Sequence, residues 1–449
     1  MEFNFALSRE LFSSAEIDTG TVLLLKVFSE ELDKGLLREL QNRTGPLHIL
    51  DAGSGCGVIG ICAARALEGI DVRTISTDRD ELAGIFTGYN ARQNGLRCEK
   101  FSTHTSTLFN GNPARDLILS NIPAKAGKPV LEDFIRRACP HCEALAFIVA
   151  VKPLADFTRG TIAAAGAEIL RETAGRGHTV FVFRKGRAAP GPGGGFRRNC
   201  FAPRIEGTSS AEDSSGSNTV GEEETFTGVY RRQRLETELE GCALGMDTFH
   251  GAPGFDDPGE AVLAAVKLSR KLGLNTAPGG EANLKNSLKN SNSIEVSSTG
   301  TFHANRLFHE TEQGCYPLWF YKTSSPEKTR NGKAILSGRN ILALKAAEYN
   351  LKDTVNTVLI PAADLASAKD ALLGEGPYSF IAALPENILR ESIPSHWEAL
   401  TVLLRARGVF LISLPSFLAE QFDRAKISGF SRLGNVRREG FRALAYRKA

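Results

Sequence analysis

The chain has 449 residues, of which 42% are hydrophobic and 23% charged, and its formal net charge is +3. This length is too great for one ordinary domain and suits two or three. The composition is typical of a soluble globular protein. A charge of +3 neither requires nor excludes a nucleic-acid partner.

No targeting or membrane segment is expected. The N-terminal stretch MEFNFALSRELF carries acids and lacks the basic-then-apolar layout of a signal peptide. No apolar run approaches the ~18 residues of a membrane helix. Eight cysteines in so long a chain do not form a disulfide framework, so we expect reduced thiols and a cytoplasmic protein.

Cys139 and Cys142 form a C-P-H-C pair that is open to a redox or metal-binding interpretation. One such pair lacks the four ligands of a structural zinc site. It also falls where a turn between a helix and a strand is expected. A structural role is therefore favoured, and no metal site is predicted.

The first part of the chain alternates strands and helices. Asp18 and Gly20 precede an apolar-rich helix, which a short acid can cap. The elements expected after it are a strand at 47–51, a glycine loop, a helix to about 67, a strand ending at 78, a helix at 80–94, a short strand near 98–103, a strand followed by a Pro-containing loop over 114–127, a helix at 129–138, a strand at 143–151, a helix at 153–165 and a pair of strands ending at 184. This order, with its antiparallel finish, predicts one doubly wound α/β domain over residues 1–186.

A strand that runs into a glycine loop dominates this domain. The stretch LHILDAGSGCGVIG (47–60) ends an apolar run at Asp51 and then places Gly53, Gly55 and Gly57 at every second position. Glycine lets the backbone turn tightly and approach a ligand, and such a loop at a helix N-terminus can cradle a nucleotide-like molecule. The spacing differs from the dinucleotide fingerprint. An acid about 20 residues further on, Asp78, suits a ribose. The alternative is an ordinary α/β loop with packing glycines.

These residues match motif I of the S-adenosylmethionine-dependent methyltransferases, hydrophobic-D-x-G-x-G-x-G, from Asp51 to Gly57. With the stretches LFSSAEIDTGTVLLL, STDRDELAGIFTGYNARQNG and DLILSNIPAKAGKPVLEDFI, the chain resembles the methyltransferase small-domain family. That family includes bacterial ribosomal RNA guanine-N2 methyltransferases. The resemblance is specific over residues 5–186 and weak over 228–449. It implies a Rossmann-like, seven-stranded class I methyltransferase fold and S-adenosyl-L-methionine as the cofactor.

The resemblance also implies a cofactor site. The methionine end of the cofactor would be held by Asp51, Gly53, Gly55 and Gly57. The ribose would bind Asp78, the adenine would contact His104, and Asp18 and Thr21 would line the site from the N-terminal segment. A polar loop residue remains the alternative for His104, and a plain helix cap the alternative for Asp18.

The substrate loop is altered. Many methyltransferases that act on planar amino groups carry [N/D/S]-P-P-[F/Y/W], in which carbonyl groups orient the target amine and the aromatic ring stacks on the base. Here the loop reads Ser120-Asn121-Ile122-Pro123-Ala124. The resemblance implies Asn121 and Pro123 as catalytic residues and, as substrate-binding residues, Ile122, Ala124, Lys125 and Lys128. The lysines would contact phosphates if the substrate is RNA, and otherwise form a solvated loop face.

The second half repeats the first. Residues 187–224 read as a Gly/Pro/Ser/acidic linker, and 275–300 as a low-complexity insertion in a domain over 225–449. The matching dipeptides are Gly55-Cys56 with Gly314-Cys315 (314 − 55 = 259), Tyr89-Asn90 with Tyr349-Asn350 (349 − 89 = 260) and Arg184-Lys185 with Arg447-Lys448 (447 − 184 = 263), together with Pro123 and Pro385 (385 − 123 = 262). Such steady offsets predict a duplication.

The second copy is expected to be degenerate. On these offsets, the residues opposite Asp51, Gly53 and Gly57 are Glu310, Glu312 and Tyr316, while Gly338 replaces Asp78 and Ala383 replaces Asn121. A carboxylate and a ring would block the close backbone approach that the cofactor requires. The second domain is therefore predicted to keep the fold without binding the cofactor.

The favoured function is methyl transfer from S-adenosyl-L-methionine to an exocyclic amine, guanine N2 of ribosomal RNA. The partner would then be ribosomal RNA or a ribosomal subunit. Two alternatives stay open: a methyltransferase with a protein or small-molecule acceptor, and a non-catalytic module that binds RNA or the ribosome. The sequence leaves the oligomeric state undetermined.

Overall fold

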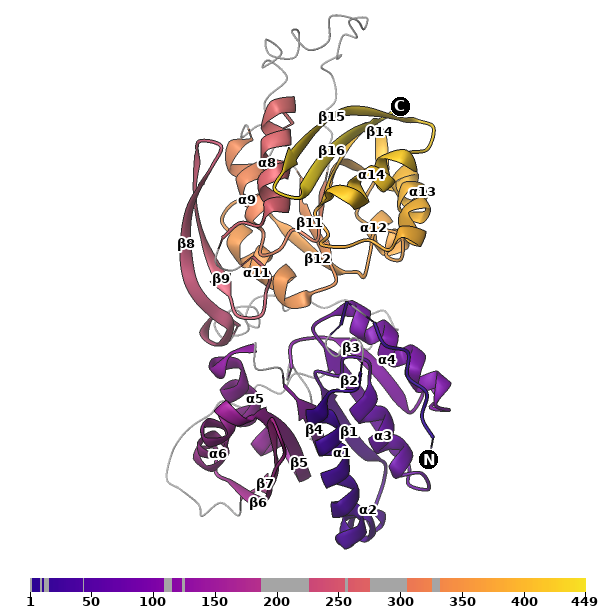
Figure 1. Ribbon diagram of the computed structural model, residues 1–449, viewed down its shortest axis with the longest axis vertical. Coiled ribbons are helices and arrows are strands. Elements are labelled where there is room, and N and C mark those ends of the chain that lie inside the picture. The colour runs from indigo at the N-terminus through magenta and orange to yellow at the C-terminus, as the bar shows by residue number, and fades with distance from the viewer. Residues whose placement is uncertain are drawn as a thin grey trace, which may run out of the picture. The chain divides into compact units, whose positions relative to one another are not determined.

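The computed structural model describes residues 2–8, 10–11, 16–42, 44–108, 115–122, 126–186, 226–254, 257–274, 305–324 and 332–449. The chain forms two compact units, Met1–Arg231 and Arg232–Ala449, and each is an α/β fold (Figure 1). The expected linker and the expected insertion lie outside the described residues.

The first unit is built on a seven-stranded sheet with the strand order β3-β2-β1-β4-β5-β7-β6. The strands are β1 (Leu47–Ala52), β2 (Val72–Asp78), β3 (Phe101–Thr105), β4 (Arg115–Asn121), β5 (Cys142–Val151), β6 (Ala167–Ala174) and β7 (His178–Lys185). Strands β1 to β5 pair in parallel, and β7 runs antiparallel to both β5 and β6. The predicted doubly wound fold and its antiparallel finish are confirmed.

Helices cover both faces of this sheet, because successive strand residues point to opposite sides. Ile49 packs on one face with α1 (Thr19–Glu31) and α3 (Val58–Ala66), while its neighbour Leu50 packs on the other with α5 (Lys128–His141). The remaining helices of the unit are η1 (Leu32–Leu36), α2 (Leu37–Gln41), α4 (Glu81–Gln93), η3 (Lys152–Leu154) and α6 (Ala155–Ala164). Figure 1 shows α1, α3 and α4 on one side of the sheet and α5 and α6 on the other.

The second unit repeats the sheet strand for strand, in the order β12-β11-β10-β13-β14-β16-β15. Its strands are β10 (Arg306–His309), β11 (Ala334–Gly338), β12 (Thr357–Pro361), β13 (Tyr378–Ala383), β14 (Leu404–Pro415), β15 (Phe430–Arg438) and β16 (Phe441–Lys448). A two-stranded hairpin of β8 (Arg231–Leu239) and β9 (Cys242–Phe249) precedes them. The predicted duplication is confirmed by this matching order.

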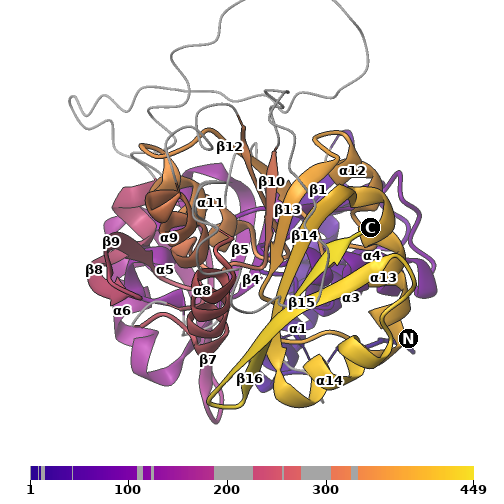
Figure 2. The ribbon, with the colours of Figure 1, turned by 90° about the horizontal axis from the view of Figure 1, so that it is seen from above.

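The helices of the second unit also divide between two faces. Buried side chains of α8 (Glu260–Leu272), α9 (Cys315–Thr323) and α11 (Ile341–Leu351) share one hydrophobic cluster. Those of α12 (Lys369–Leu373), α13 (Ile393–Leu403) and α14 (Ser416–Arg424) share the cluster on the opposite face, and η4 (Arg390–Ser392) directly precedes α13. Figure 2 shows the two groups on either side of the sheet.

The alignment of the two glycine loops needs a correction. Gly57 and Gly314 each precede a helix, α3 or α9, in a left-handed conformation with φ of 83° and 88°. The offset is therefore 314 − 57 = 257 rather than 259, and the residues opposite Gly53 and Gly55 are Glu310 and Glu312. Aligning the loops on the shared Gly-Cys dipeptide shifted them by two residues. The register is fixed instead by the glycine that directly precedes the helix in each unit.

The corrected register changes two other pairings. Phe308, not Glu310, stands opposite Asp51, and Tyr316 lies inside α9 rather than opposite Gly57. Leu384 rather than Ala383 corresponds to Asn121, because Ala52 pairs with Ser120 as His309 pairs with Ala383. The match of Asp78 with Gly338 is confirmed, since each residue ends its strand.

Three further expectations concern membranes, metals and thiols. In the part of the chain that the structure describes, no helix is long and apolar enough to cross a membrane. Within the same residues, no group of three or more His, Cys, Asp or Glu side chains could hold a metal ion. Cys139 lies in the last turn of α5 and Cys142 begins β5, and burial raises the pKa of these thiols to about 11 and about 12, which makes them poor nucleophiles and metal ligands near neutral pH.

Candidate functional site

The site lies at the carboxyl edge of the first sheet, where β1 ends in a buried acid. Asp51 is fully buried, and its Oδ2 accepts hydrogen bonds from the Gly60 backbone N–H (2.9 Å) and the Ser76 hydroxyl (3.4 Å). Its Oδ1 has no hydrogen-bond partner among the described residues. Burial, with a smaller contribution from the charge of Asp78, raises the pKa of Asp51 to about 7.

The glycine loop follows, and its glycines have different roles. Gly53, Gly55 and Gly57 all have positive φ, which L side chains rarely adopt. A Cβ at Gly57 would lie 2.8 Å from the Thr87 Cγ2, so this glycine allows the loop to pack against α4. A Cβ at Gly55 would meet no atom within 4 Å. The loop therefore packs against α4 at Gly57, whereas the space beside Gly55 is free of atoms of the described residues.

Asp78 holds the loop in place from the end of β2. Its Oδ2 accepts from the Gly55 backbone N–H (2.9 Å), and its Oδ1 accepts from the Asp80 backbone N–H (3.0 Å). Burial raises the pKa of this carboxyl. Each carboxylate oxygen has a second lone pair, so Asp78 can bind the loop and still accept from a ligand hydroxyl.

A second cluster joins the N-terminal helix to the end of β4. Asp18 caps α1, with its Oδ2 accepting from the backbone N–H groups of Gly20 (2.8 Å) and Thr21 (3.3 Å). The Asn121 Nδ2 donates to the same Asp18 oxygen (2.8 Å) and to the Thr21 hydroxyl (3.0 Å). Both amide hydrogens are thereby used, which leaves the Asn121 Oδ1 as an acceptor for an incoming donor.

The structure places the other predicted site residues less centrally. His104 is exposed on the edge strand β3, in register with Thr77 of β2. Ile122 is 6% exposed and packs in the hydrophobic cluster beside α5, which leaves little of its side chain for a substrate. Lys128 begins α5, exposed, with its Nζ 5.4 Å from the centre of the Phe157 ring. The predicted residues Pro123, Ala124 and Lys125 lie outside the described residues.

Asn90, on α4, joins two segments that border the candidate site, a role that was not predicted from the sequence. Its buried Nδ2 donates to the carbonyl oxygens of Cys56 (2.9 Å) and Ala6 (3.0 Å), and its Oδ1 accepts from the Ala6 N–H (2.8 Å). It therefore ties the glycine loop to the N-terminal segment. The signal was the repeated Tyr-Asn pair, since Asn350 makes the equivalent bonds to Gln313 (3.0 Å) and Asp247 (2.9 and 2.8 Å) in the second unit.

The equivalent place in the second unit is filled by a side chain. Glu312 stands where Gly55 is open, and its carboxylate accepts from the Gly259 N–H at the start of α8. A Cβ at Gly254 or Gly259 would collide with this carboxylate. Burial, with the charge of Glu386, raises the pKa of Glu312 to about 7. Phe308, opposite Asp51, packs against Phe320 and Phe380 instead of presenting an acid.

A seven-stranded sheet of this order, with an acid and a glycine loop after its central strand and a second acid after the next, defines the class I methyltransferase architecture. Over the whole chain the fold is similar to that of the T. thermophilus 16S rRNA N2 G1207 methyltransferase (RsmC), solved in complex with AdoMet and guanosine. The TM-score is 0.54 and the identity 13%, and the match covers 100% of this chain and 96% of that one.

Residues 2–146 match the model of one family, the methyltransferase small domain. A curated relative, the uncharacterized protein YbxB of Bacillus subtilis (strain 168), is 32% identical over 147 residues. That match covers 32% of this chain and 65% of the length of YbxB.

Proposed function

We propose that the first unit is an S-adenosylmethionine-dependent methyltransferase. The observation that carries this proposal is the arrangement of Asp51, Gly55 and Asp78: a buried carboxylate with one unpartnered oxygen, an open glycine, and a second acid bonded to the same loop. These residues fit the cofactor, because its ammonium suits an ionised Asp51 and its ribose hydroxyls suit Asp78. The AdoMet-bound RsmC structure shares this fold.

The residues around Asn121 suit an amine acceptor. When bound, the cofactor supplies an electrophilic methyl group. The Asn121 Oδ1 accepts a hydrogen bond from one N–H of the acceptor, which turns the lone pair of the nitrogen toward the methyl group. Asp18 and Thr21 hold the Asn121 amide in the orientation this requires, since both accept from its Nδ2.

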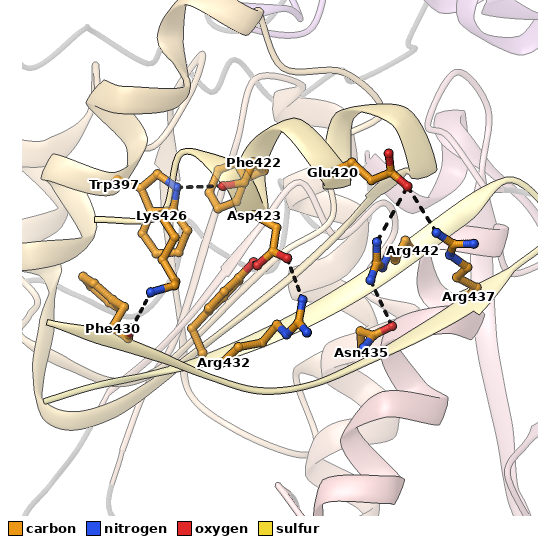
Figure 3. Close-up of polar contacts among 11 residues, drawn as sticks. Trp397, Glu420, Phe422, Asp423, Lys426, Phe430, Arg432, Asn435, Arg437 and Arg442 are labelled. Atoms are coloured by element: carbon orange, nitrogen blue, oxygen red, sulfur yellow. Dashed lines mark hydrogen bonds and ion pairs between the residues drawn. The ribbon is translucent and has the colours of Figure 1, made fainter. Parts of the chain in front are cut away.

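The proposed acceptor is guanine N2 in ribosomal RNA. The fold shared with RsmC over the full chain supports this choice. So does the charge of residues 404–449, which carry 8 Arg and 2 Lys against 3 Asp or Glu, a net charge of 10 − 3 = +7 within a chain of +3. Figure 3 shows part of this region, where Arg432 pairs with Asp423 (2.6 Å) and Arg437 with Glu420 (3.1 Å). An excess of cations of this kind attracts phosphates.

The second unit, in this proposal, does not bind the cofactor. Three changes support this: the Glu312 carboxylate stands where Gly55 is open, Phe308 replaces Asp51, and Gly338 replaces Asp78. The unit would then contribute stability and a basic surface rather than chemistry.

The test is titration calorimetry of S-adenosylmethionine into the full chain. We expect one binding site per chain in the wild type and no measurable binding by Asp78→Ala, because that change removes both the ribose acceptor and the bond to Gly55. The absence of binding by the wild type would contradict the methyltransferase proposal. Two sites, or one site that Asp78→Ala leaves intact, would contradict the assignment of the site to the first unit alone.

A further inference from the structure

A short helix from beyond the linker belongs to the first unit. Residues 226–230 are helical, and the first unit extends to Arg231. These residues lie more than 70 positions beyond the end of the family match at residue 146. The sequence FTGVY brings two aromatic rings, Phe226 and Tyr230, which stack with their centres 5.6 Å apart and their planes 26° apart.

Contacts of Tyr230 place this helix at the carboxyl edge of the first sheet. Its phenol shares a hydrogen bond with the Thr107 hydroxyl, two residues beyond the end of β3. It also interacts electrostatically with Arg79, which follows Asp78 directly, and with Asp133 and Arg137 of α5. Burial raises the pKa of Tyr230 to about 12, so the phenol is neutral and donates a hydrogen bond near neutral pH.

This position corresponds to one end of the proposed cofactor. If Asp78 binds the ribose, the base attached to that ribose lies within reach of the residue after Asp78 and of the segment after β3. Tyr230 interacts electrostatically with Arg79, the residue after Asp78, and shares a hydrogen bond with Thr107 in the segment after β3. A purine has two flat apolar faces, and an aromatic ring is the partner on which such a face stacks.

We propose that Tyr230, presented by the 226–230 helix, forms the wall of the cofactor site on which the adenine of S-adenosylmethionine stacks. This inference rests on the proposed function and extends it. The site is then assembled from two stretches, 51–107 and 226–230, of which only the first lies in the family match. His104, which the resemblance assigns to the adenine, is exposed on β3 and is not needed for this wall.

The first arm of the test measures the affinity of the full chain for S-adenosylmethionine by calorimetry. We expect Tyr230→Ala to bind roughly 5- to 140-fold more weakly, the range for loss of one base–aromatic stack. Tyr230→Phe keeps the ring and should stay within about threefold of the wild type. Tyr89→Ala is the matched control, because it removes another tyrosine of the first unit that is 46% exposed on α4.

The second arm reports stacking directly. Trp319 and Trp397, the chain's two tryptophans, both lie in the second unit, so Tyr230→Trp adds the first indole to the first unit. With the wild-type signal subtracted, adenosine and S-adenosylmethionine should quench this new emission, and methionine should not. Quenching by guanosine but not adenosine would assign the ring to the acceptor base and overturn the proposal.

The remaining outcomes separate the two hypotheses. Wild-type binding that Asp78→Ala loses and Tyr230→Ala keeps would overturn the adenine wall and leave the methyltransferase proposal standing. Weaker binding by Tyr230→Ala without any quenching in Tyr230→Trp would also overturn the wall, since the ring would then act only through packing. No binding by the wild type would overturn both.

Discussion

Individual side chains in this protein do two things at once. The Asp78 carboxylate accepts hydrogen bonds from the glycine loop and still has lone pairs that could accept from a ligand. The Asn121 amide donates both hydrogens to Asp18 and Thr21 at the start of the N-terminal helix, and its Oδ1 can still accept a hydrogen bond. The family resemblance assigns these residues to the ligand alone. The structure adds that these side chains also hold the glycine loop and the N-terminal helix in place, so binding of a ligand here would require less ordering.

In the proposed function, the amide of Asn121 orients the acceptor amine. We expect Asn121→Ala to lower kcat for methyl transfer about 10²- to 10³-fold, as for loss of one oriented hydrogen bond at a reacting centre, with cofactor affinity changed less than about fivefold. Asn94→Ala is a matched control, because its Nδ2 also donates to the N-terminal segment, at Asn4 (2.8 Å). The test is to measure kcat and cofactor affinity for both variants. A kcat of Asn121→Ala close to that of the wild type would refute the positioning role.

Asp51 makes the first unit sensitive to pH. Its folded pKa of about 7 lies above its ordinary value of 3.8. Between these values the folded unit keeps a proton that the unfolded chain has lost. Stability therefore falls as pH rises through this window, by up to about 4 kcal/mol, and is constant above it.

Asp51→Asn removes this titration and keeps an acceptor for the Gly60 N–H. The variant should gain stability relative to the wild type as the pH rises from about 4 to about 7, as followed by thermal unfolding. The pKa of Glu312 is also raised to about 7. Because both proteins contain Glu312, its contribution to the pH dependence of stability cancels in the comparison. Parallel pH profiles for the two proteins would show that Asp51 does not titrate in this range.

At the level of elements, each unit holds its central loop with the same device. An asparagine in the helix after the second strand bonds the loop and a segment that precedes the first helix. This explains why the Tyr-Asn pair recurs at an offset of 260. The shared Gly-Cys pair has no such role and misled the alignment. A dipeptide therefore predicts register only where its side chains make the same bonds in both copies.

The two asparagines form a matched experiment. Asn90→Ala should lower the stability of the first unit by about 2 kcal/mol, because it leaves buried backbone groups unpaired, and should weaken cofactor binding at least tenfold by releasing the glycine loop. Asn350→Ala should cost similar stability in the second unit with cofactor affinity unchanged within about threefold. Calorimetry and thermal unfolding distinguish these effects, and equal loss of affinity in both variants would count against a cofactor site confined to the first unit.

At the scale of the whole molecule, the order of elements could be predicted because buried parallel strands and glycine loops leave strong local patterns. The strand positions at 47–51 and 143–151 and the cap at Asp18 are confirmed. The contacts of Asn121 with Asp18 and the placement of Tyr230 could not be predicted. They join residues about 100 positions apart, and no periodicity in one sequence records such pairs.

The two units share one fold but differ in what fills the same place. In the first, Gly55 leaves space beside an unpartnered carboxylate oxygen. In the second, Glu312 closes that space and caps a helix. In the second unit a side chain thus occupies the space that is open in the first, as expected if this copy does not bind the cofactor.

The most direct test of the account is transfer of a labelled methyl group from S-adenosylmethionine to ribosomal RNA transcribed in vitro, followed by digestion and identification of the modified nucleoside. We expect N2-methylguanosine from the wild type, none from Asp78→Ala, and formation by Asn121→Ala that is slower by the factor given above. Label that appears only in protein or small molecules, or in no acceptor while the cofactor binds, would contradict an RNA methyltransferase built on this site.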